Sequence, residues 1–150
     1  MENSDSKDPE NLVKDNWITL YRRISLGFAI VFAGVGLLFL LIPGTVLRLF
    51  SEISFSFGLQ SSPFEGINFY LILAVGYMYV VTMLAWLMYR QPENRSFPVL
   101  LLNAKTASSV LSFVFFIGVN QALIYLLNGI VDGLITGGVY LMYRMQRSAR

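Results

Sequence analysis

Four long apolar runs alternate with polar connections along the 150 residues of the chain. The runs cover residues 21–42, 68–89, 98–119 and 122–143. Each run has about 22 residues, which at about 1.5 Å per residue is enough to cross a hydrocarbon core of about 30 Å. A segment in lipid must satisfy its backbone polar groups internally, so each run is expected to be a helix. The pattern therefore predicts an all-α, polytopic transmembrane four-helix bundle.

The polar segments divide the rest of the chain. Residues 1–16 are polar and carry charges of both signs, so we expect a disordered tail before a membrane domain at 17–147. The only long connection is residues 44–67. Its stretch "TVLRLFSEI" would place Val46, Leu49, Phe50 and Ile53 on one helical face. That arrangement is typical of a short interfacial helix, and the alternative is an irregular loop.

The basic residues predict an orientation. Nine of the 11 lysines and arginines lie on the side of the membrane that holds both termini and the connection between the second and third runs. They are Lys7, Lys14, Arg22, Arg23, Arg90, Arg95, Arg144, Arg147 and Arg150. Of the other two, Arg48 lies in the 44–67 connection and Lys105 inside the third run. The positive-inside rule then places both termini in the cytoplasm, N-in and C-in, and residues 44–67 outside the cell membrane.

Composition narrows the chemistry. The chain is 55% hydrophobic and 13% charged, and its mean hydropathy is +0.61. This composition predicts an integral membrane protein whose main partner is the lipid bilayer. The basic residues behind the net charge of +2 lie mostly at the ends of the apolar runs, where they set the orientation in the membrane. We therefore expect no nucleic-acid partner. The sequence contains no cysteine and no histidine, which removes thiolate chemistry, the commonest general base and the commonest metal ligand. We therefore expect no catalytic, cofactor-binding or metal-binding residues.

Two charged residues inside the runs form the candidate site. The short "GVNQ" turn at residues 118–121 makes the third and fourth runs an antiparallel hairpin. Counting from this turn, Lys105 lies level with residues 134–135, less than one helical turn from Asp132. Either charge alone at the bilayer centre costs about 2.5–3.5 kcal/mol. The sequence therefore predicts that Lys105 and Asp132 form an ion pair between adjacent helices.

Further polar residues extend this pair into a seam between the two helices. At 100° per residue, Ser109 and Ser112 share the face of Lys105, while Asn128 and Thr136 share the face of Asp132. The predicted seam thus consists of Lys105, Asp132, Asn128, Ser109, Ser112 and Thr136. Small residues suited to close helix packing occur beside it and in the first run: Gly129, Gly133, Gly137, Ser25, Ala29, Ala33 and Gly36.

The seam has three interpretations. It can specify helix packing and register, with polar contacts worth about 0.6–2 kcal/mol each. It can instead be a proton or ion relay, or a pocket for a polar headgroup, because ionisable residues inside membranes mark such sites. In the third interpretation Lys105 snorkels towards water and Asp132 meets another subunit.

The layout also resembles a known family. "GLLFLLIPGTVLRLF", "LLNAKTASS" and "NGIVDGLITGGVYLMYR", within residues 21–145, resemble segments of small DoxX-like bacterial membrane proteins. Such proteins often carry an arginine early in the third helix, where this chain departs with Lys105, and an acidic or polar residue in the fourth, as at Asp132. The resemblance implies a four-helix inner-membrane fold, with no defined activity attached.

Three functions follow as hypotheses. The first is a non-enzymatic accessory or interaction subunit that docks with a partner membrane protein or forms a homo-oligomer. The alternative is a small proton-coupled transporter, or a lipid- or anion-binding protein, that uses Lys105 and Asp132. An enzyme acting on lipid ranks last, because its base would have to be Asp132 or a tyrosine alone.

Overall fold

A computed structural model describes residues 9–60 and 67–148 of the chain. The described residues form the helices α1 (Pro9–Leu41), α2 (Pro43–Ser56), α3 (Ile67–Arg90), α4 (Ser96–Gly118) and α5 (Leu123–Ser148). Four of them contain segments long and apolar enough to cross a membrane: Asn16–Leu41, Tyr70–Arg90, Ser96–Gly118 and Leu123–Met145. The prediction of an all-α protein with four membrane-spanning helices is therefore confirmed at this level.

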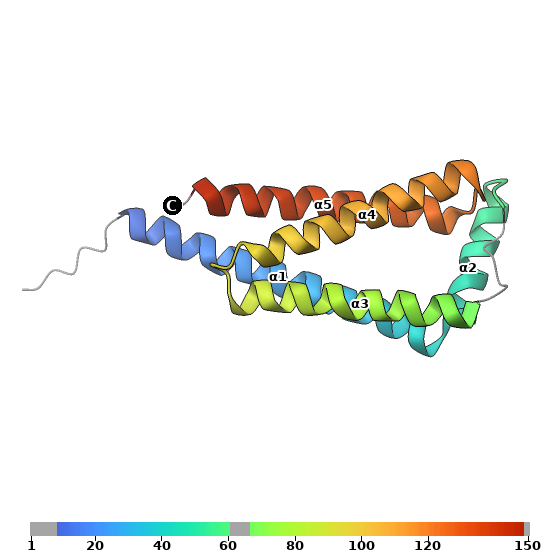
Figure 1. The fold of residues 1–150 in the computed structure, drawn as a ribbon, viewed down its shortest axis with the longest axis horizontal. Helices are drawn as coiled ribbons and strands as arrows, with labels where there is room; N and C mark the ends of the chain where they lie inside the picture. Colours follow the sequence, from blue (N-terminus) through green and yellow to red (C-terminus); the bar gives the residue numbers. More distant parts are fainter. Residues whose placement is uncertain (1–8, 61–66, 149–150) are drawn as a thin grey trace, which may run out of the picture.

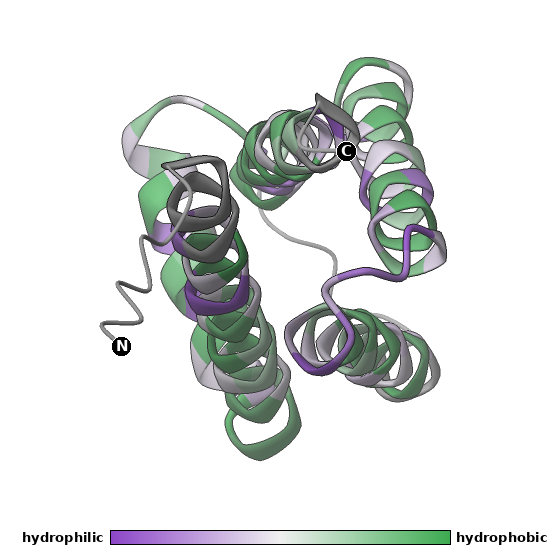
Figure 2. Cartoon of the chain, turned by 90° about the vertical axis from the view of Figure 1, so that its left-hand side faces the viewer, coloured by the Kyte–Doolittle hydropathy of each residue, from purple (hydrophilic) through white to green (hydrophobic). Residues whose placement is uncertain are grey.

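The long helices pair as α1 with α3 and α4 with α5, and α3 also packs against α4 (Figure 1). The α3–α4 connection and the C-terminal end of α5 lie at one end of the bundle, where α1 also begins. Helix α2 and the α4–α5 turn lie at the opposite end. Figure 2 shows hydrophobic residues along most of each long helix and a hydrophilic connection between α3 and α4. This distribution is the one that a lipid environment selects.

Helix α1 begins earlier than the sequence predicted. The expected tail reached residue 16, but the helix already starts at Pro9. Proline suits the first turn of a helix, because the N–H that it lacks would have no partner within the helix there. The helix thus continues beyond its apolar part into the polar segment, and residues 1–8 lie outside the described residues.

Helix α2 resolves the alternatives for the long connection in favour of a helix. It follows α1 almost directly, with Pro43 in its first turn, and it lies across the end of the bundle (Figure 1). Leu47 and Ser54 are its buried residues. Leu49 and Ile53, from the predicted apolar face, remain exposed. The face of α2 that contacts the bundle is therefore the one next to the predicted apolar face.

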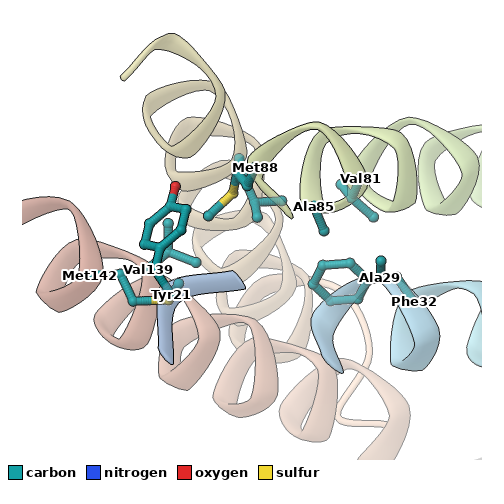
Figure 3. Packing of buried hydrophobic residues seen from close by; sticks show 9 residues of the cluster. Tyr21, Ala29, Phe32, Val81, Ala85, Met88, Val139 and Met142 are labelled. Atoms are coloured by element: carbon teal, nitrogen blue, oxygen red, sulfur yellow. The ribbon is translucent and has the colours of Figure 1, made fainter. Parts of the chain in front are cut away.

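The interior of the bundle is a single cluster to which all four long helices contribute (Figure 3). Its buried members are Tyr21, Ala29, Phe32, Val81, Ala85, Met88, Leu101, Val139 and Met142. The small face predicted for the first run is used here, because Ser25, Ala29 and Gly36 are all buried. A Cβ atom at Gly36 would lie only 3.1 Å from the Cβ of Met78, so this glycine lets α1 and α3 approach closely.

Candidate polar site within the bundle

Lys105 and Asp132 lie opposite each other on α4 and α5. The ammonium Nζ of Lys105 donates a hydrogen bond to Asp132 Oδ1 at 2.7 Å. The two side chains expose only 3% and 4% of their surface. The ion pair that the sequence predicts is present, at hydrogen-bond distance and inside the bundle. Because charge-assisted hydrogen bonds of this length are strong, the pair fixes the register of the two helices.

Aromatic rings from the other two long helices cover the ammonium group. Lys105 Nζ lies 4.6 Å from the centre of the Phe32 ring of α1 and 5.2 Å from that of Tyr77 of α3. The Tyr77 hydroxyl donates to the carbonyl of Ala104 at 3.0 Å, which holds its ring in place. A cation over an aromatic face is stabilised most when it is removed from water. All four long helices therefore meet at Lys105.

The α4–α5 interface continues the seam beyond the ion pair. Ser109 Oγ donates to the Gly129 carbonyl at 2.7 Å, and Asn128 Nδ2 donates to Ser112 Oγ at 2.7 Å. Asn128 is exposed at the bundle surface, whereas Ser109 and Ser112 are buried. A Cβ at Gly133 would lie 3.3 Å from Ser109 Oγ. The predicted polar residues and glycines thus work together in the close approach of these two helices.

Thr136 behaves differently from the other predicted seam residues. Its Oγ1 is buried and has no hydrogen-bond partner among the residues that the structure describes. The same holds for the second carboxylate oxygen of Asp132 and for the hydroxyls of Tyr21 and Ser25 on α1. The structure thus separates a bonded seam between α4 and α5 from a group of unbonded oxygens on α1 and α5.

Sequence reasoning missed several of these residues as parts of the site. Phe32 gave no distinct signal, because aromatic residues are common throughout the apolar runs, and Tyr77 gave only a weak one, its spacing of seven residues from Tyr70 on one helical face. Tyr21 lies at the start of the first apolar run, where nothing in the sequence indicated a buried site, yet it is only 1% exposed. Ser25 did carry a signal, because it begins the small face of the first run and is fully buried.

Across residues 9–60 and 67–148, no group of three or more histidine, cysteine, aspartate or glutamate residues could hold a metal ion. Comparison with known proteins gives no match to a family model, a curated protein or a solved structure. The likeness to DoxX-like proteins therefore stays a prediction from the sequence.

Proposed function

We propose that the chain is a non-enzymatic, multi-pass protein of the cytoplasmic membrane that acts as an accessory or interaction subunit. The observation that carries this proposal is the closed ion pair. Lys105 and Asp132 bind each other at 2.7 Å, and the rings of Phe32 and Tyr77 cover the ammonium. Their charges are thereby used to hold four helices in register, which leaves the outer surface of the bundle for recognition.

Helix α1 offers the surface best suited to a partner helix. A Cβ added at Gly27 or Gly34 would meet nothing within 4 Å, so neither glycine serves a close approach inside the chain. Glycine costs about 1 kcal/mol relative to alanine in a helix. The two lie seven residues apart and hence on one face, beside exposed Val31 and Leu38. Small residues on such a face let a second transmembrane helix pack closely.

The interaction hypothesis is tested by photo-crosslinking in native membranes. Because the chain has no cysteine, a single Gly34→Cys change can carry a thiol-linked photo-crosslinker at this face. We expect a discrete product, either at twice the mass of the chain or at the mass of one other membrane protein. Val110→Cys on α4 is the control, since Val110 is 55% exposed and no glycine lies within four residues of it. Equal, diffuse labelling from both positions would overturn the proposal.

The proposed orientation has both termini in the cytoplasm, supported by the nine basic residues on that side of the helices. Exposed Ser56 on α2 and exposed Gln91 in the α3–α4 connection lie at opposite ends of the bundle. In intact cells, a membrane-impermeant maleimide is expected to label Ser56→Cys and not Gln91→Cys. The reverse pattern would invert the topology.

One observation favours the second candidate, a proton-coupled or ligand-binding membrane protein. Asp132 Oδ2 is buried, and no described residue bonds it. A purely structural pair has no need of this free oxygen.

A further inference from the structure

Four buried oxygens on α1 and α5 lack a hydrogen-bond partner among the described residues. They are Tyr21 Oη, Ser25 Oγ, Asp132 Oδ2 and Thr136 Oγ1. Tyr21, Ser25 and Asp132 are only 1%, 0% and 3% exposed. The great majority of buried side-chain oxygens in proteins bond to protein or to ordered water, because an unsatisfied one destabilises the fold. These four oxygens therefore call for partners from outside the chain.

The four residues lie at successive levels of two antiparallel helices, α1 and α5. Near one end of the bundle, the Tyr21 ring lies beside Val139 and Met142 (Figure 3). Further in, the Phe32 ring lies 4.6 Å from Lys105 Nζ, which is bonded to Asp132. Since α1 and α5 run in opposite directions, the path from Tyr21 to Phe32, about 16 Å, matches the path from Met142 to Asp132, about 15 Å.

This register places Ser25 and Thr136 at nearly the same level along the bundle axis. Ser25 lies one helical turn, about 6 Å, from Tyr21, and Thr136 lies one turn from Asp132. Interpolation between the two fixed ends sets Ser25 and Thr136 within about 3 Å of each other along the bundle axis. One water molecule that bonds two groups spans about 5.5 Å, because each O–H···O bond is about 2.7–2.8 Å long. Along the bundle axis the steps from Tyr21 to Ser25, Thr136 and Asp132 are about 6, 3 and 6 Å, which is close to the span of one bridging water molecule.

We propose that ordered water molecules join Tyr21, Ser25, Thr136 and Asp132 Oδ2 and exchange protons between Asp132 and the end of the bundle that holds the α3–α4 connection. The site binds water and relays one proton. A hydronium ion at that end of the bundle gives up a proton, each water in the line loses one O–H bond as it gains another, and the last O–H bond forms on Oδ2. In net terms hydronium becomes water and the carboxylate becomes a carboxylic acid. This inference does not depend on the interaction role and gives the chain a second property.

The other groups around Asp132 favour a proton path that opens only towards the Tyr21 end of the bundle. The ionisable groups that face it are Lys105 from α4, Tyr77 from α3 and, at the far end of the line, Tyr21 from α1. Towards the α2 end of the bundle, Ser109 is bonded to the Gly129 carbonyl. A proton therefore reaches Asp132 from the Tyr21 end, and its arrival weakens the bond to Lys105. The α4–α5 seam would thereby respond to protons from that side.

The direct test measures proton exchange at Asp132 in lipid vesicles. In a Lys105→Met variant the stranded carboxylate takes up a proton, and its acid C=O band is followed by infrared spectroscopy. The band is assigned by its loss in Lys105→Met/Asp132→Asn. After transfer to D₂O we expect the band to shift within the mixing time. Adding Thr136→Val should slow this shift by about tenfold, as expected for the loss of one hydrogen-bonded link.

Ser109→Ala in the same background is the matched control, because Ser109 lies off the line and is bonded to Gly129. It should leave the exchange rate unchanged. Slow exchange in the Lys105→Met parent would overturn the water path. An equal effect of Thr136→Val and Ser109→Ala would also overturn it.

A second measurement keeps Lys105 and so does not depend on the folding of that variant. Thr136→Val replaces a hydroxyl by a methyl group of similar size. If water binds Thr136 Oγ1, the variant unfolds at a lower midpoint, as should Thr82→Val, whose hydroxyl donates to the Met78 carbonyl at 2.7 Å. If Oγ1 is dry, valine removes an unsatisfied atom and raises the midpoint. A raised midpoint for Thr136→Val beside a lowered one for Thr82→Val would overturn the proposal.

Discussion

The energetics of the Lys105–Asp132 pair can be measured with a double-mutant cycle. The variants are Lys105→Met, Asp132→Asn and the two together. Each single change strands a buried charge, because the pair is only 3% and 4% exposed and its hydrogen bond is 2.7 Å long. Breaking a buried pair in this way typically costs about 3–5 kcal/mol.

The structure predicts that the two single variants are unequal. In Lys105→Met the stranded carboxylate keeps an Oδ2 that no described residue bonds, so the loss should reach about 3–5 kcal/mol. In Asp132→Asn the ammonium keeps the Phe32 and Tyr77 rings at 4.6 and 5.2 Å. A desolvated cation–π contact is worth about 2 kcal/mol, so this loss should be nearer to about 1–3 kcal/mol.

The double variant removes both charges and should recover most of the loss. Replacement of a buried ion pair by neutral groups is often close to neutral, so we expect a net loss of about 1 kcal/mol. The two single losses together come to about 4–8 kcal/mol, so the resulting coupling energy is about 3–7 kcal/mol, at or above the upper end for residues in contact. This coupling, and the order of the two single variants, are the quantities that the structure predicts.

Reversible unfolding by SDS in mixed micelles, followed by circular dichroism, gives the three free energies of unfolding. Ser109→Ala is the reference, because it removes one interhelical hydrogen bond of 2.7 Å without stranding a charge. Such bonds in membranes average about 0.6 kcal/mol. A coupling below about 0.5 kcal/mol, or single variants as stable as the parent, would refute the structural role of the pair.

Three further predictions concern other contacts of the bundle. Gly36→Ala should destabilise the fold by about 1–3 kcal/mol, because the added Cβ would lie 3.1 Å from Met78 Cβ. Gly76→Ala should stabilise the fold by about 0.5–1 kcal/mol, because its added Cβ would meet nothing within 4 Å. Unfolding of both variants in SDS measures the two effects. Ser54→Ala should lower the free energy of unfolding by about 1 kcal/mol and speed hydrogen exchange at the Leu123 amide, which donates to Ser54 Oγ at 3.0 Å. Ser56→Ala removes only an exposed hydrogen bond within α2 and should have neither effect. Tyr77→Phe should lower the free energy of unfolding by about 0.5–1.5 kcal/mol, because it removes the hydrogen bond to the Ala104 carbonyl. Tyr77→Leu should lower it further, because it also removes an aromatic ring over Lys105. Equal losses of stability in the two variants would contradict the cation–π contact.

The amino-acid sequence was sufficient to predict the features that a lipid environment imposes on the fold. Apolar runs of membrane length predicted all four spans to within a few residues, as the observed Ser96–Gly118 and the predicted 98–119 illustrate. The ion pair was also predictable, because only one acidic residue lies in the predicted runs and a short turn fixes its depth relative to Lys105. In a hydrocarbon environment two such charges have few alternatives to each other.

Contacts between apolar residues distant in the sequence were not predictable. Nothing in the composition of the first or second run distinguishes Phe32 or Tyr77 from other aromatic residues that face lipid. The contact between α2 and α5 depends on a hydrogen bond between Ser54 and Leu123, which are 69 positions apart. Helical periodicity alone favoured the Val46–Ile53 face of α2, because it reports where apolar residues gather and not which neighbour will cover them.

The two sides of Asp132 bear on what the chain does. Towards α4, Oδ1 is bonded to Lys105, and the neighbouring Ser109 and Gly129 bond each other. In contrast, Oδ2 and the hydroxyls of Thr136 and Ser25 have no partner among the described residues. A pair selected only for packing would gain by replacing Thr136 and Ser25 with valine and alanine, since each unsatisfied hydroxyl costs about 1–3 kcal/mol. The stability of Thr136→Val therefore separates the two roles: a gain indicates a packing device that tolerates two poor residues, and a loss indicates a hydrated site that those residues maintain.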